Sequence, residues 1–462
     1  MTGPLAGVRI LDLTHFVAGP WCTMLLADLG AEITKIEPLD GEISRTMGGV
    51  YASGESAIFL GFNRGKRSLA LDLKRPEGLA IAQQLAREAD VVVQNFRPGT
   101  AERLEMDAVR LRADHEELIY CAITAFGSGG PYASRPGNDP IIQALSGAMS
   151  ATGSAGGVPI RMGVSLPDLS AGMLAATAIL AALHRRTLSG EGANIELNLL
   201  DSQMFSQMNL LTDLVEPGST IRQADGQAWL HATYLCQDGL ALCLDTDDSA
   251  RFADAVREVT GDSFPASATL DPDDQSNKAM LRSQLAAVFA GQPRESWLSI
   301  LHRRGIDCAP VLGLDDVLGK PVQTIQLEHP TVGRLRQVRT PVTVDPPWPV
   351  VDTPPPRLGE HSRNILQRNG ITSTEIDRLA EQGVIADGPA QTFNPEDTRS
   401  TQCGDPRGMR LAKPPGKTMP AALVAGPPQT LPPVPTASAL LASRIVATRS
   451  GRTPKTSPRS NK

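Results

Sequence analysis

The chain has 462 residues, enough for two or three domains with a sizeable buried core. Aromatic residues make up only 4% of it, which argues against a surface built for stacking on bases. The net charge is −6, yet residues 386–462 carry 11 Lys/Arg against 4 Asp/Glu, so the preceding part is strongly acidic. An acidic body binds phosphate backbones poorly, and we expect no nucleic-acid partner.

The first hundred residues alternate between strand and helix patterns. Apolar runs at 8–13, 31–37, 68–73 and 90–94 predict strands, and the segments 19–29 and 76–87 predict helices between them. Strands that alternate with helices form parallel sheets, so the expected fold class is α/β with a Rossmann-like parallel sheet. Ligands of such sheets bind outside the carboxyl ends of the strands. The first run is not followed by a GxGxxG turn, so nothing indicates a dinucleotide.

The later segments are less regular. Residues 169–184 predict a small, apolar helix that ends in a basic cluster before Gly190, and a strand is expected at 195–200. The apolar run is shorter than the roughly 18–20 residues that span a bilayer, so no membrane partner is expected. Seven prolines within 341–357 predict an extended segment, and 372–384 predict a last helix capped by Ser373 or Thr374.

These patterns divide the chain into four parts. Residues 1–210 are the N-terminal part of a large α/β domain, 215–325 a smaller α+β domain, and 326–385 a segment that returns to the large domain. Residues 386–462 hold 13 prolines and little periodicity, which predicts a disordered, basic tail. The N-terminus lacks the pattern of a signal sequence, so a cytoplasmic protein is expected. The six cysteines and seven histidines show no metal-binding spacing, so no metal is expected.

Asp168 directly precedes the predicted helix 169–184. The simplest interpretation is an N-cap, because an aspartate there accepts hydrogen bonds from the first helical amides. The same place, near the positive end of the helix dipole, favours an ionised carboxylate, and an ionised carboxylate can act as a covalent nucleophile. The small residues Ser170, Ala171 and Gly172 leave room either for a ligand or for close helix packing.

Six stretches, in order over residues 5–385, resemble the class III CoA-transferases. This family includes formyl-CoA transferase and carnitine CoA-transferases, and its superfamily includes α-methylacyl-CoA racemase. The stretches are residues 18–20 with 26–37, 63–68 with 71–74, 95–99, 127–131 with 143–147, 167–173, and 358–361 with Leu366. Their order and coverage are more specific than any single motif, and the tail lies outside the resemblance.

The resemblance implies an enzyme that moves coenzyme A from an acyl-CoA thioester to a carboxylic acid through an aspartyl-CoA thioester on Asp168. Coenzyme A is then a substrate, and no permanently bound cofactor is expected. The resemblance also implies an interlocked homodimer. Pro38 stands where some members have an arginine toward the nucleotide, so that contact is missing or supplied elsewhere. The positions that correspond to the family's CoA contacts are Val17, Ala18, Lys74, Asn95, Phe96, Arg97 and Arg103.

Asp139 matches an acidic position near the family's active site. It is expected either to position a substrate or to orient Asp168, and an Asx turn before Pro140 explains it equally well. Arg161, shortly before Asp168, is a candidate partner for an acceptor carboxylate. The donor and acceptor acids, the direction of flux and the role of the tail stay open.

Two alternatives remain beside the transferase. A racemase needs a base on each face of the α-carbon, but Asn138 stands at the position of the racemase histidine, and 245–251 holds no glutamate. A CoA-binding scaffold without turnover would not need the Asp168 carboxylate. Formyl-CoA specificity is disfavoured, because the segment between Val215 and Trp229 contains only Gly218 and Gly226 where a glycine-rich loop is expected.

Overall fold

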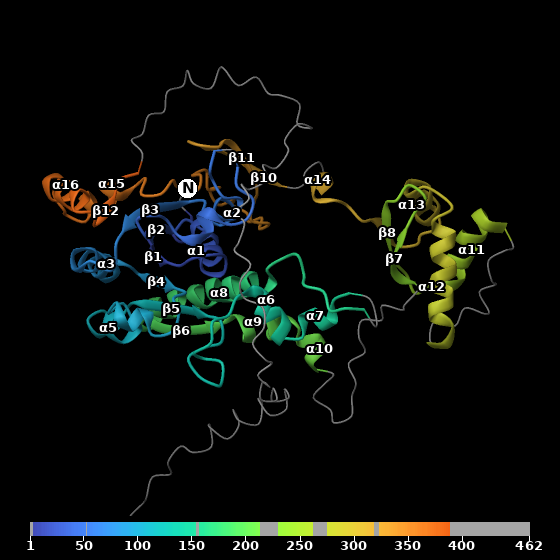
Figure 1. Cartoon of the computed structure of the whole chain (residues 1–462), viewed down its shortest axis with the longest axis horizontal. Helices are drawn as coiled ribbons and strands as arrows, with labels where there is room; N and C mark the ends of the chain where they lie inside the picture. Colours follow the sequence, from blue (N-terminus) through green and yellow to red (C-terminus); the bar gives the residue numbers. More distant parts are fainter. Residues whose placement is uncertain are drawn as a thin grey trace, which may run out of the picture. The chain divides into compact units, whose positions relative to one another are not determined.

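A computed structural model describes residues 3–51, 53–153, 157–212, 230–261, 275–317 and 323–388 (Figure 1). The segment in which a glycine-rich loop was sought, 215–229, lies outside these residues. The predicted disordered tail 386–462 lies outside them as well, except for its first three residues.

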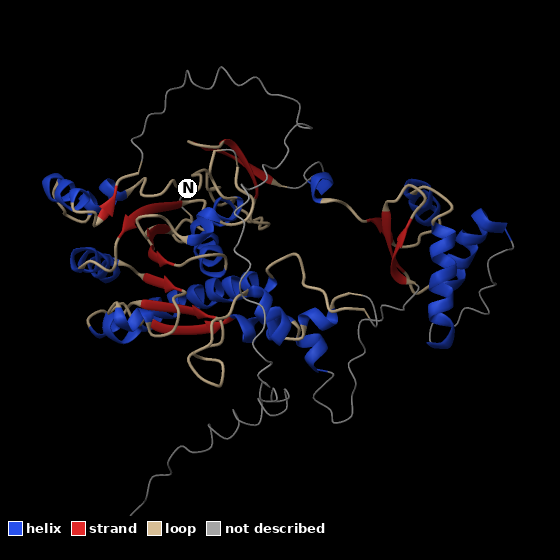
Figure 2. Ribbon diagram, in the orientation of Figure 1, coloured by secondary structure: helices blue, strands red, loops and turns tan. Residues whose placement is uncertain are grey.

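A seven-stranded sheet forms the centre of the large domain (Figure 2). Its strands are β1 (Arg9–Leu13), β2 (Glu32–Glu37), β3 (Lys66–Leu71), β4 (Val91–Gln94), β5 (Ile119–Thr124), β6 (Ala193–Asn198) and β12 (Ile385–Ala386). They lie in the order β12-β3-β2-β1-β4-β5-β6, and every neighbouring pair is parallel except β12 with β3. The α/β class expected from the alternating sequence pattern is confirmed.

Helices cover both faces of this sheet (Figure 1). One apolar core joins the sheet to α1 (Ala18–Asp28) and α8 (Leu166–Ser189), through side chains such as Leu26 and Ile179. A second core joins the opposite face to α3 (Pro76–Glu88), α5 (Ala108–Ala113), α15 (Ser362–Arg368) and α16 (Ser373–Glu381). Thr372 caps α16 by accepting a hydrogen bond from the amide of Glu375, so the predicted caps Ser373 and Thr374 were wrong.

Shorter elements occupy the connections. Two of them, α4 (Thr100–Arg103) and α6 (Asp139–Leu145), follow β4 and β5 and so begin at the carboxyl edge of the sheet, where the sequence predicts a ligand site. The others are the 3-10 helix η1 (Ile43–Thr46), α2 (Ala57–Phe62), α7 (Ala148–Ala151), α9 (Leu199–Ser206), α10 (Met208–Thr212), and the antiparallel strands β10 (Thr324–His329) and β11 (Gly333–Val338).

Helix α8 is longer than predicted, because it begins at Leu166 and ends at Gly190, a glycine with φ +72°. Its 24 residues are long and apolar enough to cross a membrane by length and composition, which corrects the expectation that this segment is too short. Half of the most apolar stretch of α8 is buried inside the protein, and Ala175 and Ile179 pack in the sheet core. A buried core helix of a soluble protein meets the same criterion, so the length is weak evidence for a membrane span.

The segment that resembles the family's C-terminal signature docks on β3. The amide of Gly359 donates to Ser68 Oγ at 2.9 Å, and the amide of His361 donates to the Ser68 carbonyl at 3.0 Å. Gly359 has φ +65°, and a Cβ there would lie 2.6 Å from the carbonyl oxygen of Ala386. Glycine is therefore required at this turn, which leads the chain back to the sheet edge.

Residues 230–261 and 275–310 form a smaller α+β module. Its sheet contains β7 (His231–Leu235), β8 (Ala241–Asp245) and β9 (Cys308–Pro310), and its helices are α11 (Ser249–Thr260), α12 (Gln275–Phe289) and α13 (Arg294–Arg303). The core is aromatic, with the Phe289 ring 4.6 Å from that of Tyr234 and 4.8 Å from that of Trp297. A single-turn helix, α14 (Leu314–Val317), follows.

Candidate active site

Asp168 is the third residue of α8, within its first turn rather than directly before the helix. Ser165 is the N-cap residue, and among the described residues no group donates a hydrogen bond to the Asp168 carboxylate. The N-cap interpretation is therefore wrong. This carboxylate is available for a role other than holding the end of the helix.

The acidity of Asp168 differs from the expectation based on the helix dipole. Its pKa is raised to about 7, mainly by burial and also by the negative charge of Asp139, and the positive charge of Arg161 opposes both. Desolvation outweighs the dipole here, because removing water disfavours the charged form of a carboxyl group. Asp168 therefore titrates near neutral pH and is not a strongly acidic group.

Asp139 and Arg161 form an ion pair next to the start of α8. Arg161 Nη2 donates to Asp139 Oδ2 at 2.8 Å, and Gln143 Nε2 donates to both Asp139 oxygens at 3.1 and 3.0 Å. Gln143 Oε1 accepts from the Met162 amide at 2.9 Å, which ties α6 to the segment that enters α8. These side-chain partners differ from the Asx turn considered for Asp139, so that turn is not the observed arrangement.

The start of α1 lies against the same face of α8. A Cβ on Gly172 would lie 2.5 Å from the Ala18 carbonyl oxygen and 2.8 Å from Trp21 Cδ1, so Gly172 permits close packing of the two helices. Of the two roles left open for the small residues, packing is the one that Gly172 fills. Asp168 precedes Gly172 by four residues and therefore lies on the same face of α8.

A buried ion pair fixes the first turn of α1. Asp12, at the end of β1, accepts from Thr23 Oγ1 at 2.7 Å and from Lys66 Nζ at 3.0 Å. Lys66 Nζ also donates to the Pro20 carbonyl at 3.0 Å, inside α1. Burial alone would raise the pKa of Asp12, but Lys35 and Lys66 hold it well below its ordinary value. The pair is therefore charged and joins two strands to α1.

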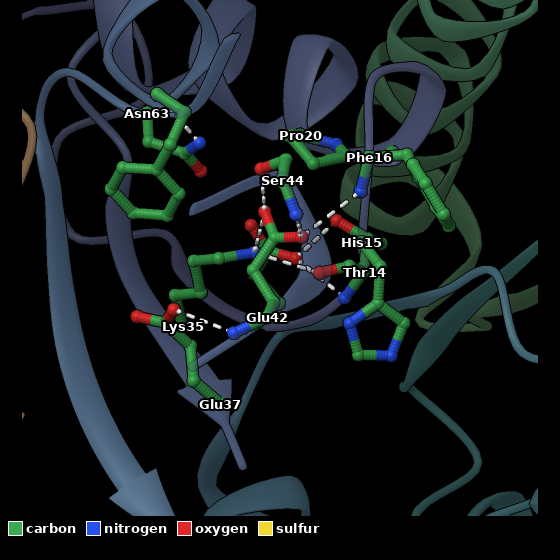
Figure 3. A network of polar contacts seen from close by, with 12 residues as sticks. Thr14, His15, Phe16, Pro20, Lys35, Glu37, Glu42, Ser44 and Asn63 are labelled. Carbon is green, nitrogen blue, oxygen red and sulfur yellow. Dashed lines mark hydrogen bonds and ion pairs between the residues drawn. The ribbon is translucent and has the colours of Figure 1, made fainter. Parts of the chain in front are cut away.

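Glu42 continues this network toward the turn between β1 and α1 (Figure 3). Its buried carboxylate accepts from Ser44 Oγ at 2.6 Å and from the Phe16 amide at 3.2 Å, while Lys35 Nζ donates to the Thr14 carbonyl at 2.7 Å. Phe16 has φ +64°, a left-handed conformation that is rare for a large side chain. The network therefore holds a strained turn directly before Val17.

Sequence reasoning missed Glu42, Lys35 and Lys66 as parts of the site. Lys35 and Lys66 fall in stretches used for the family resemblance. A charged residue most often lies on the solvated surface, so the sequence alone did not indicate that they belong to the site. Asn95, which the resemblance places against CoA, exchanges two 2.8 Å hydrogen bonds with the backbone of His15. It orders the same turn as Glu42 does.

A cavity of about 590 Å³ opens at the carboxyl ends of β1 to β4. It brings together three of the predicted CoA contacts, Lys74, Phe96 and Arg103, and it includes Pro38. Among the described residues that line it, Lys74 is the one lysine and Arg103 the one arginine. No further lysine or arginine of this lining therefore takes the place of the arginine that some members have at the position of Pro38. The full lining is Leu13, His15, Ile36, Glu37, Pro38, Leu39, Asp40, Leu71, Asp72, Leu73, Lys74, Phe96, Thr100, Arg103 and Leu104.

The remaining predicted contacts do not line this cavity. Arg97 is exposed, and its carbonyl accepts from the Thr100 amide at 3.0 Å. Val17 is the N-cap residue of α1 and Ala18 its first helical residue, and the Ala18 carbonyl oxygen lies against Gly172 of α8. Among the described residues there is no group of three or more His, Cys, Asp or Glu side chains that could hold a metal ion.

Comparison with known proteins assigns the family. The model of CoA-transferase family III matches residues 5–362. The chain is 34% identical to succinyl-CoA:glutarate CoA-transferase of Mus musculus over 398 residues, 83% of this chain and 90% of that protein. It is 34% identical to acetyl-CoA:oxalate CoA-transferase of Acetobacter aceti over 331 residues, 69% of this chain and 83% of that protein.

The fold agrees with this assignment. A crystal structure of a CaiB/BaiF family protein from Brucella suis superposes with a TM-score of 0.71 at 28% identity, covering 80% of this chain and 100% of that one. A match across three quarters of the chain, relatives above 30% identity and a shared fold together confirm the resemblance drawn from the sequence. The chain belongs to CoA-transferase family III and is an enzyme of that class.

Proposed function

We propose that the protein transfers CoA from an acyl-CoA thioester to a carboxylic acid through covalent catalysis by Asp168. The observation that carries this proposal is a partly buried carboxylate, in the first turn of α8, that no described residue hydrogen-bonds. A desolvated carboxylate is a stronger nucleophile than a hydrated one, and its charge costs folding energy that a purely structural residue need not impose.

The chemistry needs no net proton transfer. The Asp168 carboxylate attacks the thioester carbonyl, and the C–S bond breaks to release CoA thiolate and leave a mixed anhydride. The thiolate attacks the aspartyl carbonyl and releases the donor acid, which forms the aspartyl-CoA thioester. The acceptor carboxylate attacks this thioester, whose C–S bond breaks to release CoA thiolate and leave a second anhydride, and the thiolate then attacks the acceptor's carbonyl. Acceptor-CoA leaves and the Asp168 carboxylate is regenerated.

Mass spectrometry of the Asp168 peptide tests this route. Protein incubated with a panel of acyl-CoA donors should carry a CoA adduct on that peptide, and CoA should appear on an added acid. Asp168→Asn and Asp168→Ala proteins should carry no adduct. Binding of CoA with neither adduct nor exchange, for any donor and acceptor pair, would contradict covalent catalysis.

The raised pKa of Asp168 predicts a pH-dependent donor reaction. Only the ionised carboxylate attacks, so kcat/KM for the acyl-CoA donor should be constant well above pH 7 and fall about tenfold per pH unit well below it. The pH profile of the free enzyme measures this pKa directly. Asp139→Asn removes the neighbouring negative charge and should move the profile to lower pH. A flat profile between pH 5 and 8 would contradict the assignment.

We propose that the cavity at the ends of β1 to β4 holds the nucleotide end of CoA, with Lys74 and Arg103 as its phosphate ligands. Both side chains are exposed, so an ion pair of either one with a phosphate contributes less binding free energy than a buried ion pair would. The Lys74→Gln/Arg103→Gln double variant should raise KM for acyl-CoA about tenfold with little change in kcat, and less at high salt.

A matched control for the double variant is Arg87→Gln, which removes an exposed arginine of α3 that does not line the cavity. It should leave KM unchanged. Arg97→Gln compares the sequence assignment with the cavity: a larger effect for Arg97 than for Arg103 would place the phosphates outside the cavity.

We propose dicarboxylic acids as the substrate class. One relative above is named for succinyl-CoA and glutarate and the other for acetyl-CoA and oxalate, and in each name the acid paired with the acyl-CoA has two carboxyl groups. The site supports this class because a cation, Arg161, lies next to the start of α8 together with Asp139.

We also propose that the protein is a homodimer. Large apolar side chains are exposed on the helices that carry Asp139 and Asp168, namely Ile141 and Leu145 of α6 and Met173 of α8. Clustered exposed apolar side chains are typical of protein interfaces. Light scattering during gel filtration should give twice the mass of the chain, and a monomer at micromolar concentration would contradict this.

A further inference from the structure

Arg161 combines a fixed position with unused hydrogen-bonding capacity. Its Nη2 donates to Asp139 at 2.8 Å, and its other guanidinium N–H groups have no partner among the described residues. Half of the Arg161 side chain is exposed, whereas the Asp139 side chain is 5% exposed. One edge of the guanidinium is thus anchored to a buried carboxylate, and five donors in a planar group leave a second edge open to a ligand.

The spacing between Arg161 and Asp168 is set by the protein itself. Gln143 binds the Met162 amide at 2.9 Å and the Val164 carbonyl at 3.4 Å, and that carbonyl also accepts from the Leu166 amide at 2.8 Å. These bonds fix the chain from Arg161 to the first turn of α8. Arg161 also lowers the pKa of Asp168, so its charge acts at the reacting carboxylate.

The segment that carries Arg161 also has three exposed apolar side chains close to it in the sequence. Ile160 directly precedes Arg161, and Val158 and Val164 lie within three residues of it, all three exposed. The segment that carries Arg161 therefore offers a ligand exposed apolar side chains as well as a cation. Glutarate has both kinds of group, with methylene groups between two anionic ends.

We propose that Arg161 binds the remote carboxylate of a dicarboxylic acid acceptor while the other carboxylate reacts at Asp168. This inference rests on the proposed CoA transfer and identifies the residue that selects the acid. An arginine binds a carboxylate through two parallel, charge-assisted hydrogen bonds. An acid of the same length with one carboxyl group leaves the guanidinium unpaired, so Arg161 determines the preference for dicarboxylic acids.

The test compares two acceptors of equal length, glutarate and pentanoate, with one acyl-CoA donor throughout. Arg161→Gln should lower kcat/KM for glutarate about 10- to 100-fold and change kcat/KM for pentanoate little. Arg161→Lys keeps the charge without the planar fork and should give an intermediate preference. Arg185→Gln, an exposed arginine of α8 paired with Glu191, is the control and should leave both values unchanged.

A second variant separates direct binding from an effect through Asp139. Arg161→Gln leaves Asp139 without its cation, whereas Asp139→Asn/Arg161→Gln removes both charges. The preference for glutarate should stay lost in the double variant. Equal losses for the two acceptors, or a preference restored by the double variant, would overturn the role of Arg161. An absent aspartyl-CoA adduct in the wild-type protein would instead overturn the proposed transfer, and the adduct assay on Arg161→Gln distinguishes these failures.

Discussion

Asp168→Asn is expected to lower the rate of CoA transfer by about 10⁴-fold or more, because it removes the atom that forms the covalent bond. Asparagine has nearly the same shape and stays neutral at every pH, so binding of acyl-CoA should change little. Asp168→Glu moves the carboxylate by one methylene group and should also lose most of the activity, since covalent catalysis depends on close positioning. Steady-state kinetics with a saturating donor measure these losses.

Stability distinguishes a nucleophile from a structural residue at this position. The pKa of Asp168 is raised on folding, so the folded state binds its proton more tightly than the unfolded state. Ionised Asp168 therefore destabilises the fold, with the cost absent below about pH 4 and fully present above about pH 7. Asp168→Asn should raise the melting temperature at pH 8 and leave it unchanged at pH 4. A lower melting temperature together with retained activity would indicate a structural carboxylate.

The fold was largely predictable because its signals are local. Alternating apolar runs and helical segments place β1 to β4 and α3 close to their observed bounds, and the parallel sheet follows from their order. The predicted start of α8, at residue 169, came from the apolar run alone, whereas the helix begins at Leu166 and holds Pro167 in its first turn, where proline is well tolerated. That displacement of three residues produced the incorrect N-cap interpretation of Asp168.

The candidate site was only partly predictable, because its charges act across long sequence separations. Lys66 reaches Asp12 over 54 residues, and Glu42 holds the amide of Phe16. Neither contact leaves a pattern in a single sequence, and buried and exposed charges look alike there. The raised pKa of Asp168 has the same origin, since desolvation and the approach of Asp139 depend on tertiary packing.

The buried ion pair Asp12–Lys66 gives the second large effect. Asp12→Ala should lower the free energy of unfolding by about 3–5 kcal/mol, because it leaves two buried lysines, Lys35 and Lys66, without the carboxylate that both charges face. Burial already lowers the pKa of Lys66 to about 8, and without Asp12 this lysine should lose its proton near neutral pH. Urea denaturation at pH 7 measures the loss.

The pair should behave as a unit, which the double variant Asp12→Ala/Lys66→Met tests. Removing both charges should destabilise less than the sum of the two single changes, because no unpaired charge then stays buried. Glu191→Ala, which breaks the exposed pair with Arg185, should change stability by less than about 1 kcal/mol and is the control. Lys66 also binds the Pro20 carbonyl, so losing the pair should loosen the first turn of α1 and raise KM for acyl-CoA. Additive single effects would show that Asp12 and Lys66 stabilise the fold separately and would contradict a coupled pair.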